Sequence, residues 1–276
     1  MSLIMRIDEL KIKSIEIRKT IIQMIAAAKS GHPGGSLSPV ELIIALYFNK
    51  LRHDPKRLDW PDRDRVVFSK GHACPLWYAV LADFGYFPRE HLINLRQYGC
   101  ILQGHPDCLN TPGVDISSGS LGQAFSAACG MAAAGKLDSK SYRVYVLLGD
   151  GETQEGQVWE AAMSAAHYKL DNLCAILDYN QFQIDGSTKD IMQIEPLADK
   201  WKAFGWHTIE IDGHDYAQIL NAYDKAEEIK DKPAIIIAKT VKGKGVSFME
   251  HTSAWHGKAP DKEQSIQAIK EIEQGI

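Results

Sequence analysis

The chain has 276 residues, of which 45% are hydrophobic and 24% charged, as expected for a globular protein of one large domain or two small ones. A net charge of −4 gives no reason to expect nucleic acid or an anionic membrane as a partner, and no apolar stretch approaches the roughly 20 residues that a membrane helix needs. The five cysteines are odd in number and form no CxxC pair, which predicts reduced thiols and a cytoplasmic location.

Hydrophobic periodicity predicts helices and strands in alternation. Helices are predicted over 6–29, 40–48, 122–137, 153–170, 214–230 and 261–275, with further helix inside 75–97. Strands are predicted at the start of 65–75, which then runs into a loop, and over 142–148, 172–178, 206–211 and 233–240. Segments 30–39 and 99–122 are predicted to be loops, and a loop as long as the second is usually functional or disordered.

The apolar runs 142–148 and 172–178 are typical of strands covered on both faces of a parallel sheet. With the helix predicted between them they form a βαβ unit. No internal repeat and no low-complexity linker interrupts the pattern. We therefore predict an α/β fold, a doubly wound and mostly parallel sheet with helices on both faces, built as a single domain over 1–276.

Polar residues follow two of these strands. Gly149-Asp150-Gly151 follows the first, and Asn180 follows the second. A right-handed crossover places the carboxyl ends of such strands side by side, at the edge where ligands bind. The Asp150 carboxylate, the Asn180 side-chain carbonyl and the backbone carbonyl of Phe182 are hard oxygen donors. They suit Mg²⁺ or Ca²⁺.

Phosphate oxygens usually complete the coordination of Mg²⁺. Gly149 and Gly151 would let a phosphate approach the backbone, and the helix predicted after Gly151 would point its positive N-terminus at the same place. The sequence therefore predicts a metal-bridged diphosphate site. The alternative is a plain strand-to-helix turn capped by Asp150, and the matching Asn180 weighs against it.

Five of the ten histidines lie next to a glycine, which places them in loops: His32, His72, His105, His214 and His256. Imidazoles gathered in loops favour a polar pocket that binds phosphate or moves protons. A zinc site at Cys100, His105, Asp107 and Cys108 is a weaker alternative, because this spacing is not that of a known zinc finger.

Several motifs in order carry a resemblance to a known family: SGHPGGSLS, DRDRVVFSKGHACPLWYA, LQGHPD, GSLGQ, GDGETQEGQVWEAA, KTVKGKG and WHGKAP. The sequence resembles the N-terminal part of transketolases, and is most similar to the separately encoded N-terminal subunit of split members. The resemblance implies thiamine diphosphate and Mg²⁺ as cofactors. It also implies the transfer of a two-carbon ketol unit between sugar phosphates, as in the pentose phosphate pathway.

The resemblance also implies roles for single residues. His72 and His256 match histidines that contact the diphosphate, while His32, His105 and again His256 match those that hold the sugar and relay its protons. Gly119 and Leu121 match a cofactor-contacting loop. The remaining implied cofactor residues are Gly151, Asn180 and Glu155, the last of which matches a glutamate at the family's subunit contact. His214 receives no catalytic role and is expected to start a helix.

The family's cofactor-activating glutamate and its phosphate-gripping arginines belong to a domain that this chain is expected to lack. We therefore expect self-association and a C-terminal partner subunit, with two copies of each chain. The small residues of 122–137 either pack there or against their own sheet. Alternatives are a branched-sugar phosphate transketolase, 1-deoxyxylulose-5-phosphate synthase, and a non-catalytic cofactor-binding regulator. The histidines of SGHPGG and QGHPD favour transketolase over the synthase.

Overall fold

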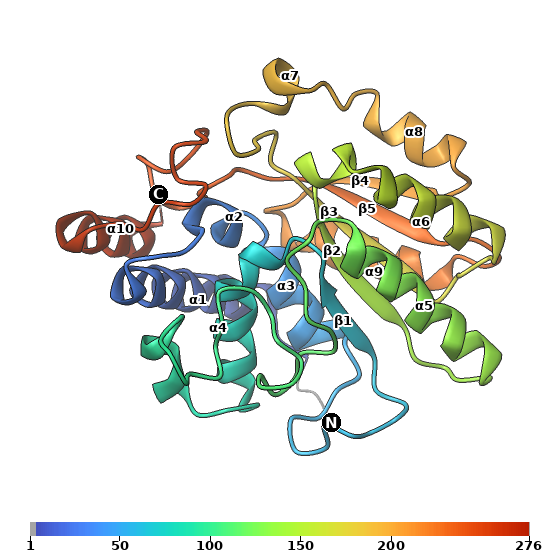
Figure 1. Cartoon of the computed structure of the whole chain (residues 1–276), viewed down its shortest axis with the longest axis horizontal. Coiled ribbons are helices and arrows are strands. Elements are labelled where there is room, and N and C mark those ends of the chain that lie inside the picture. Colours follow the sequence, from blue (N-terminus) through green and yellow to red (C-terminus); the bar gives the residue numbers. More distant parts are fainter. Residues whose placement is uncertain (1–3, 276) are drawn as a thin grey trace.

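The computed structural model describes residues 4–275, so positions 1–3 and 276 of the predicted domain lie outside the described residues. Five parallel strands form one sheet in the order β1-β2-β3-β5-β4 (Figure 1). The strands are β1 (Arg65–Phe68), β2 (Val144–Gly149), β3 (Leu173–Tyr179), β4 (His207–Asp212) and β5 (Ala234–Lys239). The predicted α/β fold with a parallel sheet is therefore confirmed.

Helices cover both faces of this sheet. Along β2, Val144, Val146 and Leu148 belong to one buried cluster, and Tyr145 and Leu147 belong to the other. The first cluster includes helices α5 (Gln123–Leu137), α6 (Gly156–His167) and α8 (Leu197–Ala203). The second includes α1 (Ile7–Ala28), α3 (Val40–Ala45), α4 (Cys74–Phe84), α9 (Tyr216–Glu228) and α10 (Lys262–Gln274). Burial on both faces explains why the central strands are apolar without alternation.

The small residues of α5 serve packing inside the domain. Ala128 and Ala132 are buried. A Cβ added at Gly135 would lie 2.9 Å from the ring of Tyr142. Of the two interpretations of this helix, packing against its own sheet accounts for these residues. Gly130 faces open space.

Three local predictions need correction. The predicted loop 30–39 contains a short buried helix, α2 (Pro33–Leu37), which Pro33 can open because its fixed φ suits the first helical position. The helix predicted over 40–48 gives way to a π-helical turn at Leu46–Lys50. The short helices α7 (Thr188–Ile191) and α8 were not predicted at all.

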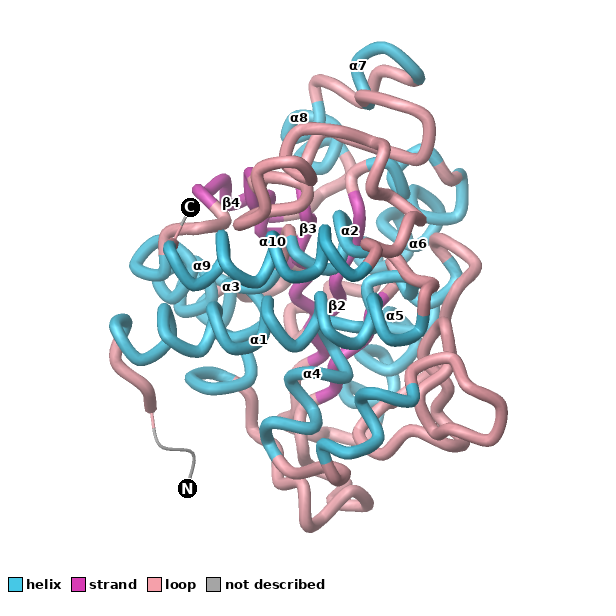
Figure 2. Tube along the Cα trace, turned by 90° about the vertical axis from the view of Figure 1, so that its left-hand side faces the viewer, coloured by secondary structure: helices cyan, strands magenta, loops and turns pink. Residues whose placement is uncertain are grey.

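The first residues of helices α9 and α10 are set by capping side chains in the local sequence. The carboxylate of Asp215 accepts hydrogen bonds from the amides of Ala217 and Gln218 at the start of α9. Asp261 and Gln264 form a reciprocal capping box at the start of α10. Figure 2 shows α10 lying along α1, which it contacts. Within residues 4–275, no helix combines the length and apolarity required to cross a membrane.

Candidate functional site

The register of the central strands sets the geometry of the site. β2 and β3 run parallel with Gly149 opposite Asp178, so the chain leaves the two strands at the same edge of the sheet. Asp150 and Asn180 are the residues just beyond this edge. A turn of 3-10 helix, Gly151–Gln154, then separates β2 from α6. α6 begins at Gly156, three residues later than the predicted start at 153, so the first turn after Asp150 is 3-10 and not α-helical.

A cavity of about 310 Å³ lies at this edge. Every residue proposed from the sequence for the site lines it: His32, His72, His105, Gly119, Leu121, Gly149, Asp150, Gly151, Glu155, Asn180, Phe182 and His256. The sequence did not single out the other lining residues for the site: Gly35, Lys70, Glu152, Gln154, Gln183, Ile184 and Lys242. Loops that are far apart in the sequence thus build one cavity.

Asp150 is a buried carboxylate, 1% exposed, with no ion-pair partner among the described residues. Its two oxygens accept hydrogen bonds from the backbone amides of Gly151, at 2.7 Å, and Gln181. Burial and the nearby Asp178 raise the pKa of Asp150 to about 7. A buried carboxylate without a counter-charge fits a site for a cation.

Asn180 is held by Asp178. The amide nitrogen of Asn180 donates to Asp178 Oδ2 at 2.9 Å, while its carbonyl oxygen accepts a bond from the Phe182 amide at 3.1 Å. Asp178 also pairs with Lys70, and both side chains are almost fully buried. Burial opposes the charge of Asp178, yet Lys70 keeps the pKa of this carboxyl below its usual value. The Asn180 carbonyl is thereby presented as an oxygen donor, in keeping with the hard-cation site that the sequence suggests.

Glu152 forms hydrogen bonds with three separate segments around the cavity. Its carboxylate accepts hydrogen bonds from the hydroxyl of Ser69 and from the amides of Gly122, at 2.8 Å, and Gly149, at 3.0 Å. Burial raises the pKa of Glu152 above its usual value although these donors oppose the shift. The residue links the ends of β1 and β2 to the loop that carries Gly119 and Leu121.

Four histidines gather in the cavity. The ring of His32 lies 5.2 Å from that of His72, 5.5 Å from that of His256 and 6.3 Å from that of His105, measured between centroids. Burial, followed by nearby cations, lowers the pKa of His32 to about 4 and that of His256 to about 3. These imidazoles are therefore neutral at physiological pH, and they act as hydrogen-bonding groups.

Lys242 brings a positive charge into this group. The residue is 2% exposed, and its ammonium donates to the carbonyl oxygen of Phe182 at 3.3 Å and to His256 Nδ1 at 3.1 Å. Burial and the neighbouring Lys70 lower the pKa of Lys242 to about 8. Because Lys70 is already paired with Asp178, Lys242 is the cation available for an anionic ligand.

Glycines keep space open around the histidines. A Cβ at Gly35 would lie 3.2 Å from His72 Nε2, and a Cβ at Gly119 would lie 3.2 Å from the ring of His105. Gly119 also has a φ of +151°, which other residues rarely adopt. Side chains at these two positions would press on the rings that line the cavity.

The remaining sequence candidates lie elsewhere. His214 is not a helix-start residue, because Asp215 caps α9; its Nδ1 contacts Glu41 Oε2 at 3.0 Å, and its Nε2 accepts a bond from the Val241 amide. Of the zinc alternative, only His105 lines the cavity. Across residues 4–275, no group of three or more histidine, cysteine, aspartate or glutamate side chains is placed to hold a metal ion.

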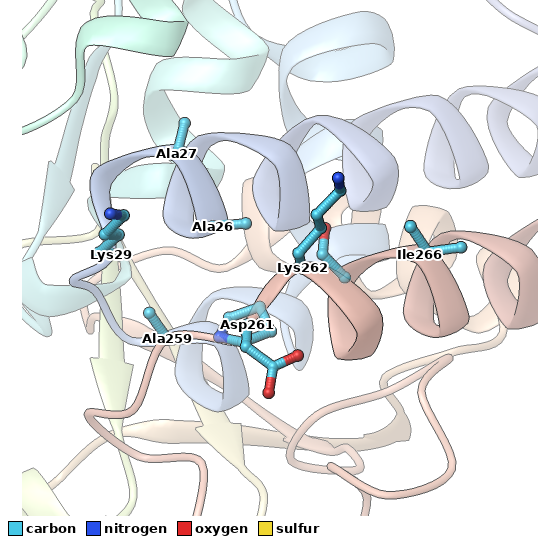
Figure 3. Close-up of a pocket in the computed structure, with 9 residues that line it drawn as sticks. Ala26, Ala27, Lys29, Ala259, Asp261, Lys262 and Ile266 are labelled. Carbon is cyan, nitrogen blue, oxygen red and sulfur yellow. The ribbon is translucent and has the colours of Figure 1, made fainter.

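A larger hollow of about 600 Å³ lies on the surface between the end of α1 and the start of α10 (Figure 3). Ala26, Ala27 and Ile266 are among the apolar residues that line it. Lys29, Asp261 and Lys262 stand at its sides. It lacks the converging polar groups of the smaller cavity, which is therefore the better candidate for chemistry.

The low pKa of His256 predicts acid sensitivity. An unfolded histidine titrates at about 6.5, whereas folded His256 titrates at about 3, so between these values only the unfolded chain takes up the proton. Acidification from about pH 7.5 to about pH 5.5 should therefore lower Tm, and the variant His256→Gln should lose a few degrees less. Calorimetry at both pH values tests this, and equal losses would contradict it.

Comparisons with known proteins identify the family. The family described as "Transketolase, thiamine diphosphate binding domain" matches residues 8–274, so the fold and the site define a thiamine diphosphate-binding domain. The chain belongs to the transketolase family.

Its relatives include separately encoded subunits. The 6-deoxy-6-sulfo-D-fructose transketolase subunit SqwG of Clostridium sp. (strain MSTE9) is 48% identical over 93% of this chain and 94% of its own length. One subunit of the apulose-4-phosphate transketolase of Phocaeicola vulgatus is 40% identical over 99% of this chain and 96% of its own length. The chain thus matches these separately encoded subunits over nearly their whole length.

The fold also matches solved transketolases. That of Campylobacter jejuni superposes with a TM-score of 0.91 and 35% identity over 98% of this chain. The match covers 43% of the Campylobacter chain. This chain therefore spans about two fifths of the length of that enzyme.

Proposed function

We propose that this chain is the diphosphate-binding subunit of a two-subunit transketolase that moves a ketol unit between sugar phosphates. The observation that carries the proposal is the cavity itself, which is lined by Lys242, four neutral histidines and the buried Asp150, a carboxylate without an ion-pair partner among the described residues. When bound, thiamine diphosphate supplies a nucleophilic carbon and an electron sink for cleaving a carbon–carbon bond of the ketose.

The family resemblance divides the residues that line the cavity into two groups. Asp150, Asn180 and the carbonyl of Phe182 would hold Mg²⁺, or Ca²⁺, against a diphosphate. Lys242 and His72 would donate hydrogen bonds to the phosphate oxygens, and Gly119, Leu121, Gly151 and Glu155 would line the same cofactor. His32, His105 and His256 would hold the sugar and move its protons.

Replacing His32 or His105 with alanine tests this division. In the enzyme reconstituted with its partner subunit, either change should reduce turnover or raise the sugar KM by about tenfold or more, because a hydrogen bond to the sugar is lost. The affinity for thiamine diphosphate should stay within a few-fold. Steady-state kinetics and cofactor titration give the two numbers. A collapse of cofactor binding would show that the division of the cavity is wrong.

The sugar itself is a further proposal. The two relatives named above differ in the sugar that their names carry, so family membership alone leaves the choice among ketose phosphates and their analogues open. Ketol transfer from a panel of ketose phosphates to aldose phosphates tests the proposal. A chain that binds cofactor but transfers no ketol unit with any partner subunit would favour the regulatory alternative.

The partner is proposed to be a C-terminal subunit that carries the pyrimidine-binding part of the site. Two findings support it: the similar relatives are named as subunits, and Ile184 lines the cavity although it is 64% exposed. Leu137 of α5 and Met163 of α6 are also exposed apolar side chains on neighbouring helices. We propose an assembly of two copies of each chain in the cytoplasm, as the simplest closed arrangement.

A further inference from the structure

Arg96 makes three hydrogen bonds behind the histidine cluster. One terminal nitrogen donates to Ser30 Oγ at 2.8 Å, and the other donates to the Gly104 carbonyl at 3.2 Å and to His32 Nδ1 at 3.2 Å. Neither the motifs nor the sequence resemblance pointed to this arginine. It reaches the cavity through His32, whose ring is part of the cavity wall.

The backbone around Arg96 is specialised for this arrangement. Arg96 has a φ of +63°, in the left-handed region that costs a residue with a Cβ roughly 1–2 kcal/mol. A Cβ at Gly104 would lie 3.1 Å from the guanidinium carbon, so any larger residue there would crowd the flat group. The Nε atom of Arg96 is buried and has no hydrogen-bond partner among the described residues. Backbone strain of this kind persists where the surrounding structure holds a residue in place, and it clusters at functional sites.

The contact decides which nitrogen of His32 carries the proton. A guanidinium group remains protonated and only donates hydrogen bonds, so His32 Nδ1 must be the acceptor. The proton of the neutral ring then lies on Nε2, for which no hydrogen-bond partner is present within residues 4–275. The other charged or titratable groups that act on His32 are His105 and Lys242, with His72 and His256 as close ring neighbours.

We propose that Arg96 is a positioning residue that fixes His32 in the Nε2–H tautomer, so that His32 donates a hydrogen bond to an oxygen in the cavity. The identity of that oxygen, a carbonyl or hydroxyl oxygen of the sugar, rests on the proposed function. The tautomer of His32 does not depend on the proposed function, because Ser30, Gly104 and Arg96, which fix it, all belong to this chain. Arg96 therefore acts on the substrate through His32 without touching it.

Nitrogen NMR of the full chain labelled with ¹⁵N-histidine tests the tautomer directly, with His32→Gln to assign the signals. In the wild type, Nδ1 of His32 should resonate as an unprotonated nitrogen and Nε2 as a protonated one. In Arg96→Met the two signals should move toward each other, because both tautomers become populated. Arg89→Met is the matched control, since Arg89 is half exposed and pairs with Asp83. It should leave the His32 signals unchanged.

Kinetics supply the second measurement. In the enzyme reconstituted with its partner subunit, Arg96→Met should raise the KM of the best ketose phosphate of a panel by about tenfold, with cofactor affinity within about twofold of wild type. Arg96→Lys keeps the charge but cannot make all three hydrogen bonds, so its KM for the ketose phosphate should lie between those of the wild type and Arg96→Met. It also replaces Arg96→Met if that variant does not fold.

Two results would overturn the proposal. The first is a wild-type spectrum with the proton on Nδ1, or a tautomer that Arg96 variants leave unchanged. The second is an unchanged ketose KM despite a changed tautomer. A wild-type enzyme without any ketol transfer would instead contradict the proposed function, while the wild-type spectrum would still decide the tautomer.

Discussion

Asp150→Ala should abolish the stabilisation of this chain by thiamine diphosphate and Mg²⁺ together. Asp150 is a buried carboxylate at the sheet edge without an ion-pair partner among the described residues, so its loss removes the negative charge that would hold the cation against the diphosphate. We expect cofactor affinity to fall by roughly two orders of magnitude, about 2.7 kcal/mol. Calorimetric titration measures the affinity, and the rise of Tm on adding cofactor and Mg²⁺ measures the linked stabilisation.

Two further variants separate loss of the site from loss of the fold. Asp150→Asn keeps the shape of the side chain and removes a charge that burial disfavours, but its amide nitrogen cannot accept the hydrogen bond of one of the two backbone amides that Asp150 binds, so without metal its Tm should stay within a few degrees of the wild-type value. The same variant should gain no stability from cofactor and Mg²⁺. Asp107→Ala alters an aspartate of another loop and should bind as the wild type does. Equal affinity of wild type and Asp150→Ala would disprove the metal site.

The central part of the fold could be predicted because its signals are local. β2 is apolar throughout and β3 is apolar up to Asp178, and a polar residue, Asp150 or Asn180, follows each strand, which indicated both the parallel sheet and the edge where the site lies. α2 was missed because SGHPGGSLS is rich in glycine and serine, which are typical of loops. Burial stabilises this helix instead, since all five of its residues are inaccessible to solvent or nearly so.

The sequence predicted the site residues that lie in loops, but it did not predict the charged residues of the site that the fold buries. The glycine-flanked histidines are visible in the sequence, whereas Lys70, Glu152 and Lys242 look like ordinary charged residues until the fold buries them. Each of the three is at most 2% exposed. Their importance arises from contacts between distant segments, as with Glu152, which joins Ser69 to Gly122. The GHA and GDGE motifs place Lys70 and Glu152 next to predicted site residues, and Lys242 lies within the KTVKGKG motif, so their positions in these motifs were the available signal.

The isolated chain should show negligible ketol transfer, even with saturating thiamine diphosphate and Mg²⁺. The resemblance assigns the glutamate that activates the cofactor to the domain following the matched region 8–274, and we propose that a second subunit supplies it. Mixing with that C-terminal subunit should raise the rate by at least about 10³-fold, because both cofactor activation and the closing of the cavity depend on it. A ketol-transfer assay on the purified chain, with and without the partner, measures this gain.

The ratio of the two chains and the variant Asp150→Ala show whether the activity comes from a site that both chains form. Activity should increase with added partner until the two chains are equimolar, since each site would take one half from each chain. Asp150→Ala should remain inactive at every ratio, which ties the activity to this cavity.

The opposite result would contradict the proposal. If the purified chain alone catalysed ketol transfer, in proportion to its concentration and with loss of activity in Asp150→Ala, it would carry its own activating acid. The acid would then have to lie within these 276 residues. Glu155 would be the first candidate, because it is an exposed carboxylate in the cavity wall.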